Sequence, residues 1–198
     1  MSSAESPELP LRIRLGWGLG SMPMSALSIT ANVLVLRFMT DTLGIAAATA
    51  AFAMSVAKIW DAVNDPLMGT ISDRVHTRWG QRLPWMVVGG LLTPIAVVSL
   101  FAAPTQSPTI TVVYMVTCTL LFATTYTMFM IPYMIMPAEI TSSYHGRTQL
   151  MSFRVVFSSM GSMAGMGLGP VLLATWGATQ EGHIKMAAVI CGISALAE

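Results

Sequence analysis

The sequence predicts an all-α integral membrane protein, a polytopic transmembrane helix bundle. Of its 198 residues, 54% are hydrophobic and only 10% are charged, whereas a soluble globular chain averages about 25% charged residues. From Leu83 to Ala138 there is no Asp, Glu, Lys or Arg, which is long enough for two membrane helices of about 20 residues each. The apolar runs are continuous and lack the alternation of a transmembrane β-barrel.

Polar residues and turns rich in Pro or Gly divide the chain into six apolar segments. The last of them is short, because the chain stops at Glu198. We therefore expect a cytoplasmic N-terminal segment over residues 1–14 and a six-helix transmembrane bundle over 15–198, with the sixth helix truncated. The predicted spans are 15–38, 45–72, 84–103, 108–138, 148–174 and 184–198.

The arginines in the short loops predict the orientation, because Lys and Arg accumulate on the cytoplasmic side of a membrane. The opposite side carries Arg37 with Asp41, an uncharged turn at 104–108, and Glu181 with Lys185. We predict a protein of the inner membrane, surrounded by lipid, with its N-terminus in the cytoplasm. The arginines on the predicted cytoplasmic side are Arg12, Arg14, Arg74, Arg78, Arg82 and Arg147.

The second predicted span contains the strongest functional signal, the sequence AKIWDAVNDPLMG at 57–69. A charged group inside a membrane is costly unless it pairs, faces a cavity or binds an ion. Asp61 and Asp65 are four residues apart, so their carboxylates share one helical face. They repel each other unless a cation lies between them or one of them takes up a proton. We predict a site for a monovalent cation, Na⁺, Li⁺ or H⁺, to which Asn64 adds a neutral oxygen.

Two other interpretations of these carboxylates are open. Lys58 lies three residues before Asp61 and would form a structural ion pair with it, which leaves Asp65 unexplained. An intramembrane aspartyl protease also uses two membrane carboxylates, but its dyad comes from separate helices, whereas both carboxylates here lie on one helix. We expect a transporter and not an enzyme.

The loop that follows this span contains GTISDRVHTRWGQRLPW at 69–85. Its Gly69, Asp73, Arg74, Gly80 and Arg82 resemble the loop signature of the major facilitator superfamily. Together, KIWDAVNDPLMGTISDR and TRWGQRLPW closely resemble the glycoside-pentoside-hexuronide:cation symporter family, which is melibiose permease-like. The resemblance continues at LGWGLGS (15–21), MTDTLG (39–44), YTMFMIPY (126–133) and GRTQLMSFR (146–154).

This resemblance implies the N-terminal half of a secondary active transporter, a symporter of Na⁺ or H⁺ with a solute. In the family, a Thr of the fourth helix joins the carboxylates and the Asn at the cation site, and Thr127 matches it here. The resemblance also implies that loop charges form ion pairs that hold the cytoplasmic face closed during alternating access. The matching residues are Asp73, Arg74, Arg78 and Arg82.

Sugar-binding members of this family use charged and aromatic side chains, and this sequence departs from them. Met24 and Ser25 replace a Lys-Asp pair in the first helix, and methionines replace an Asp and a Trp in the fourth. Arg154 keeps the place of an arginine in the fifth helix and is expected to hold an anionic group. Two alternatives are open for the substrate. It is a sugar or glycoside that other residues recognise, or it is another small organic or amphipathic solute. The candidate substrate-binding residues are Ser25, Met130, Tyr133, Met134 and Arg154.

Methionines recur in the fourth span, at 128, 130, 134 and 136. They either pack between helices that move or line a cavity for an apolar substrate. Pro132 and Pro137 in the same stretch predict a break in this helix, and broken membrane helices often border a binding site.

Partners and cofactors follow from the same resemblance. Transporters of this superfamily enclose their substrate between two six-helix halves, so we expect a C-terminal half or a second chain to complete the site. A half-transporter or membrane scaffold that does not transport and needs a partner is the alternative. The sequence has no phosphate-binding loop, and most of its basic residues lie between spans and do not follow one helix face. We expect no cofactor other than the coupling cation, and no nucleic-acid partner.

Overall fold

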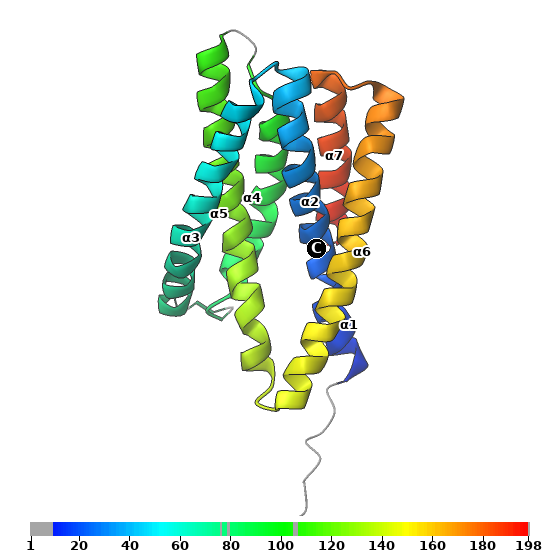
Figure 1. Ribbon diagram of the computed structural model, residues 1–198. Coiled ribbons are helices and arrows are strands. Elements are labelled where there is room, and N and C mark those ends of the chain that lie inside the picture. The colour runs from blue at the N-terminus through cyan, green and yellow to red at the C-terminus, as the bar shows by residue number, and fades with distance from the viewer. Residues whose placement is uncertain (1–9, 76, 79, 105–106, 198) are drawn as a thin grey trace, which may run out of the picture.

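The computed structural model describes residues 10–75, 77–78, 80–104 and 107–197, with the backbone alone for 195–197 (Figure 1). Residues 1–9 of the predicted cytoplasmic segment lie outside the described residues. The rest of that segment is already helical, because the first helix begins at Leu11. The described residues form only helices and connections, apart from one isolated bridge between Thr77 and Gly80.

Six helical rods make up the described part of the chain. The first rod is built from three successive elements, α1 (Leu11–Leu19), α2 (Ser21–Arg37) and the π-helical η1 (Phe38–Thr42). Every rod begins and ends within about one helical turn of a predicted span, so the all-helical fold is confirmed. The other five rods are α3 (Ala47–Arg74), α4 (Leu83–Phe101), α5 (Pro108–Ile140), α6 (Tyr144–Trp176) and α7 (Gln180–Ala197).

Four of these rods are long and apolar enough to cross a membrane by length and composition alone. They are the first rod, α4, α5 and α6. The other two, α3 and α7, carry more polar residues. In α3 these include Lys58, Asp61 and Asp65, and the first turns of α7 contain Glu181 and Lys185. The least apolar long helix is therefore the one that carries the predicted cation site.

The predicted break in the fourth span is wrong. Helix α5 runs without interruption from Pro108 to Ile140, with Pro132 and Pro137 inside it. A proline removes one backbone hydrogen bond, but neighbouring helices and side chains can compensate for this loss within a membrane bundle. Pro132 and Pro137 are both buried against the rest of the bundle. Packing thus holds the helix together across both positions.

The helices pack in two groups that meet at the centre of the bundle (Figure 1). In one group α3 lies along α5, which also packs against α4, and in the other α2 lies along α6. Close approach of α2 and α6 depends on small residues. A Cβ at Gly161 or Gly165 of α6 would collide with the backbone of Met22 or Ala26 on α2. Contacts between α2 and α3 are few, so a cavity can form between them.

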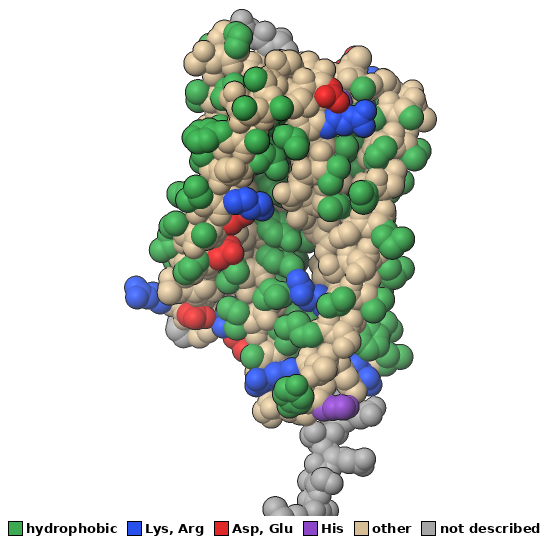
Figure 2. Space-filling view, viewed as in Figure 1, with side chains coloured by type: hydrophobic (Ala, Val, Ile, Leu, Met, Phe, Trp, Pro, Cys, Tyr) green, Lys and Arg blue, Asp and Glu red, His purple; other side chains and the backbone are tan. Residues whose placement is uncertain are grey.

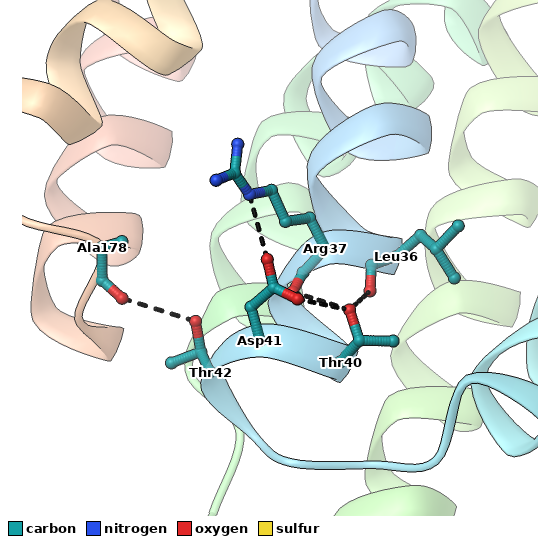
Figure 3. Close-up of polar contacts among 6 residues, drawn as sticks. All are labelled: Leu36, Arg37, Thr40, Asp41, Thr42 and Ala178. Atoms are coloured by element: carbon teal, nitrogen blue, oxygen red, sulfur yellow. Dashed lines mark hydrogen bonds and ion pairs between the residues drawn. The ribbon is translucent and has the colours of Figure 1, made fainter.

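The π-helical end of the first rod carries a small polar network (Figure 3). Arg37 forms a 3.1 Å ion pair with Asp41, and the Thr40 hydroxyl donates to Asp41 at 3.0 Å. Thr42 donates to the carbonyl oxygen of Ala178 at 3.5 Å, which connects η1 to the loop before α7. These charges are exposed, and they lie at the end of the bundle opposite the 69–85 loop.

Candidate functional site

Helix α3 places its charged side chains at mid-height on one face of the bundle. In Figure 2, acidic and basic groups gather there on a surface that is otherwise largely hydrophobic or neutral. Lys58 and Asp61 form an ion pair of 3.1 Å, and the Asp61 side chain is only 29% exposed. The predicted pairing of these two residues is therefore present, and it engages one of the two carboxylates.

Asp65 has a different partner. Its Oδ1 accepts a hydrogen bond of 2.9 Å from the Thr127 hydroxyl on α5. Thr127 is buried, with 3% of its surface exposed, so the contact holds the carboxylate against a fixed point of the neighbouring helix. The resemblance-based expectation that Thr127 lies beside the α3 carboxylates agrees with this geometry.

These residues surround a cavity of about 120 Å³ between α2, α3 and α5. At about 30 Å³ per water molecule, it has room for one small cation and a few waters. Its polar wall consists of hydroxyl, amide and carboxylate groups together with the Lys58 ammonium. Oxygen atoms are the ligands that small hard cations prefer. The polar side chains that line it include Ser28, Asn32, Lys58, Asp61, Asp65 and Thr127.

Asn64 is not brought into this cavity. It is buried, with 7% of its surface exposed, and is not among the residues that line the cavity. Its Nδ2 has no hydrogen-bond partner among the described residues. Successive residues of a helix are rotated by about 100°, so Asn64 faces a different direction from its neighbour Asp65. The structure instead supplies Ser28 and Asn32 from α2, which sequence reasoning missed because nothing local in the sequence links α2 to α3.

The candidate substrate residues lie near the junction of α2, α5 and α6. The Ser25 and Ser158 hydroxyls are 2.9 Å apart and hydrogen-bonded, which joins α2 to α6. The backbone oxygen of Arg154 accepts from the Ser21 hydroxyl at 3.2 Å. The buried Nε of Arg154 has no hydrogen-bond partner among the described residues.

Tyr133 itself is turned into the bundle. Its ring stacks on Trp17 with centroids 3.8 Å apart, and its hydroxyl donates to the Trp17 carbonyl oxygen. Met130 packs partly buried against the core, whereas Met134 is 39% exposed. Tyr133 and Met130 therefore support the packing of α5, and Met134 is presented at the surface.

The predicted loop charges separate into a buried centre and an exposed rim. Arg82, which is only 8% exposed, forms ion pairs with Asp73 at 2.9 Å and with Glu139 at 2.5 Å. Since these residues lie at the ends of α3, α4 and α5, the arginine joins three helices at one end of the bundle. Arg74 and Arg78 are exposed.

Glu139 is the functional candidate at this end that sequence reasoning missed. It is the only Asp or Glu between Asp73 and Glu181, and it lies in the last turn of α5, just after the predicted fourth span. An acidic residue at this end of the bundle can form an ion pair with an arginine of the 69–85 loop. This signal would have identified it.

Comparison with known proteins places this architecture in a family. Residues 16–197 match the family described as MFS/sugar transport protein. The chain belongs to that family. The MFS/sugar transport family is a family of transporters and not of enzymes, and the membership confirms the resemblance to glycoside:cation symporters.

Three relatives of this chain are named as symporters. The chain is 36% identical over 170 residues to the uncharacterized symporter sll1374 of Synechocystis, covering 81% of this chain and 31% of that protein. It is 30% identical over 159 residues to the inner membrane symporter YicJ of Escherichia coli, covering 80% and 35%. It is 26% identical over 159 residues to the sodium-dependent lysophosphatidylcholine symporter 1 of Xenopus tropicalis, covering 78% and 30%. The chain thus spans about a third of the length of the curated relatives that it matches.

Proposed function

We propose that this chain forms the N-terminal half of a cation-coupled solute symporter, in which Asp61, Asp65 and Thr127 bind the coupling cation. The observation that carries the proposal is the cavity between α2, α3 and α5. There two carboxylates from one helix face oxygen atoms from two others. A polar cavity of this kind at mid-height of a membrane bundle is costly to maintain unless an ion or proton occupies it.

The charges around the cavity favour a single monovalent cation. Asp61 and Asp65 contribute two negative charges and Lys58 contributes one positive charge, since all three line the cavity. One bound Na⁺, Li⁺ or H⁺ brings the sum to neutrality, which is the least costly state away from water. A divalent cation would leave one positive charge in excess. Sodium is favoured by the printed name of the Xenopus relative, a sodium-dependent symporter.

The solute in this proposal carries an anionic group and an apolar part. Arg154 offers a buried Nε without a partner among the described residues, and such a donor suits a carboxylate or phosphate. Methionines stand where sugar-binding relatives have charged or aromatic side chains, and the lysophosphatidylcholine symporter among the relatives is named for an amphipathic solute. In the proposal, Ser25 and Met134 border that site, while Tyr133 and Met130 support it by packing within the bundle.

A second six-helix half, from the same chain or another one, completes the transport cavity in this proposal. The N-terminus and the 69–85 loop lie in the cytoplasm of an inner-membrane protein. Arg82, with Asp73 and Glu139, holds the cytoplasmic ends of α3, α4 and α5 together while the outer side is open. Arg74 and Arg78, which are exposed beside this centre, contribute ion pairs to the opposite half.

Uptake by the full-length protein in proteoliposomes tests the proposed function. The probe solutes are a neutral glycoside, a glucuronide and lysophosphatidylcholine, each offered with an inward Na⁺ gradient, an inward H⁺ gradient or no gradient. We expect at least one solute to accumulate only with a gradient, and we expect Asp65→Asn to abolish that dependence. Accumulation that is the same with and without both gradients would contradict cation coupling.

A further inference from the structure

Asn32 lies on α2, on the opposite side of the cation cavity from the α3 carboxylates. It lines the same cavity as Asp61, Asp65 and Thr127. No position in the resemblance assigns a role to it. Its presence means that the cavity has an amide side chain, although this is not the Asn64 that the sequence predicted.

The orientation of the Asn32 amide is set by its own helix. Its Nδ2 donates to the backbone oxygen of Ser28 at 2.8 Å and approaches the Ser28 hydroxyl at 3.4 Å. An amide whose nitrogen is held by the preceding helical turn leaves its oxygen as a free acceptor. Among the described residues, none donates a hydrogen bond to this oxygen, and Asn32 is one of the residues that line the cavity.

We propose that Oδ1 of Asn32 is a ligand of the coupling cation, which binds between α2 on one side and α3 with α5 on the other. The proposal rests on the proposed function and deepens it. A neutral carbonyl oxygen adds a ligand for a hard cation without changing the charge of the site. One monovalent cation therefore still brings Asp61, Asp65 and Lys58 to neutrality.

This ligand gives the cation a structural effect that α3 and α5 alone would not produce. Helix α2 packs along α6 and has few direct contacts with α3. A cation held by Asn32 and the α3 carboxylates bridges these two groups of helices. Since α2 also carries Ser25, which is hydrogen-bonded to Ser158 of α6 near Arg154, occupation of the cation cavity draws the helix of the candidate substrate residues toward α3.

Sodium titration of the purified full-length protein tests this ligand, with binding measured by isothermal calorimetry. The variant Asn32→Leu keeps the size of the side chain and removes the oxygen. Loss of a hydrogen bond or ligand contact to a charged group typically weakens binding by about tenfold or more. We therefore expect the sodium affinity of Asn32→Leu to be about tenfold lower than that of the wild type.

Two further variants serve as controls. Asn32→Asp retains an oxygen at the same place, so we expect sodium to bind it at least as tightly as the wild type. Thr117→Val makes a comparable polar-to-apolar change on the exposed side of α5, where the hydroxyl only donates to the backbone of Val113. We expect sodium affinity in Thr117→Val to remain at the wild-type value.

The outcomes separate this inference from the proposed function. If Asn32→Leu binds sodium like the wild type while Asp65→Asn does not bind it, the Asn32 ligand is refuted and the α3 site stands. If Asn32→Leu does not fold, Asn32→Ala decides, and wild-type sodium affinity in that variant refutes the ligand. If the wild type binds neither Na⁺ nor Li⁺, the Asn32 ligand is refuted, and proton-driven uptake then decides the proposed function.

Discussion

The Thr127 hydroxyl of α5 donates a hydrogen bond of 2.9 Å to Oδ1 of Asp65 on α3, although the two residues are 62 positions apart in the chain. Asp61, one helical turn away, is instead engaged by Lys58 of its own helix. The two carboxylates of the candidate cation site thus have different partners. One is neutralised locally, and the other is held in place across a helix interface.

Thr127→Val is expected to weaken sodium binding by about tenfold, because it removes both the hydrogen bond to Asp65 and an oxygen at the cavity wall. Thr127→Ser keeps the hydroxyl and is expected to bind sodium nearly as well as the wild type. The measurement is a sodium titration of both purified variants. Equal affinities in the valine and serine variants would show that the hydroxyl takes no part.

Arg82→Gln is expected to destabilise the bundle by about 1–2 kcal/mol, since it leaves two carboxylates without their shared cation. Complete burial of both partners would predict a larger effect, but Asp73 and Glu139 are 58% and 50% exposed. The matched control is Arg78→Gln, an exposed arginine of the same loop, for which we expect a change within about 0.5 kcal/mol. Thermal unfolding in detergent compares the two variants, and similar melting temperatures would contradict the structural role of Arg82.

Gly161→Ala and Gly167→Ala lie on the same helix and are expected to act in opposite directions. A Cβ at Gly161 collides with the backbone of Met22, whereas a Cβ at Gly167 meets nothing within 4 Å. Alanine at 167 favours the helix by up to about 1 kcal/mol, while alanine at 161 forces α2 and α6 apart. Melting temperatures of the two variants measure this difference, and a Gly161→Ala protein as stable as Gly167→Ala would contradict the α2–α6 packing.

Arg154→Gln is expected to abolish uptake of an anionic solute and leave sodium affinity unchanged, because Arg154 does not line the cation cavity. Arg154→Lys retains the charge and is expected to keep part of the uptake. Uptake of a glucuronide and of a neutral glycoside is compared in proteoliposomes. Loss of both uptake and sodium binding in Arg154→Gln would instead indicate a general structural defect.

Local sequence features predicted the helices and one face of the candidate cation site. Long apolar runs fixed the rods to within about one turn, and the four-residue spacing of Asp61 and Asp65 placed both carboxylates at one cavity. Thr127 came from the family resemblance. These features depend on residues close together in the chain or on a shared motif.

Relations between distant helices were the part that local patterns did not reveal. Asn32 lines the cavity only because α2 lies beside α3 and α5. Glu139 pairs with Arg82 only because the end of α5 lies beside the start of α4. The expected break at Pro132 and Pro137 failed for the same reason, since packing around α5 compensates for a local defect. Asn64 has the right composition and spacing, but its rotation about the α3 axis turns it away from the cavity.

Sodium binding at equilibrium tests the central claim most directly. The variant Asp65→Asn is compared with Asp41→Asn. The control changes an exposed carboxylate in η1, at the end of the first rod and outside the candidate cation site. We predict that wild type and Asp41→Asn bind sodium with the same affinity and that Asp65→Asn shows no measurable binding. Sodium binding by Asp65→Asn with wild-type affinity would contradict the assignment of the α3 carboxylates as the coupling site.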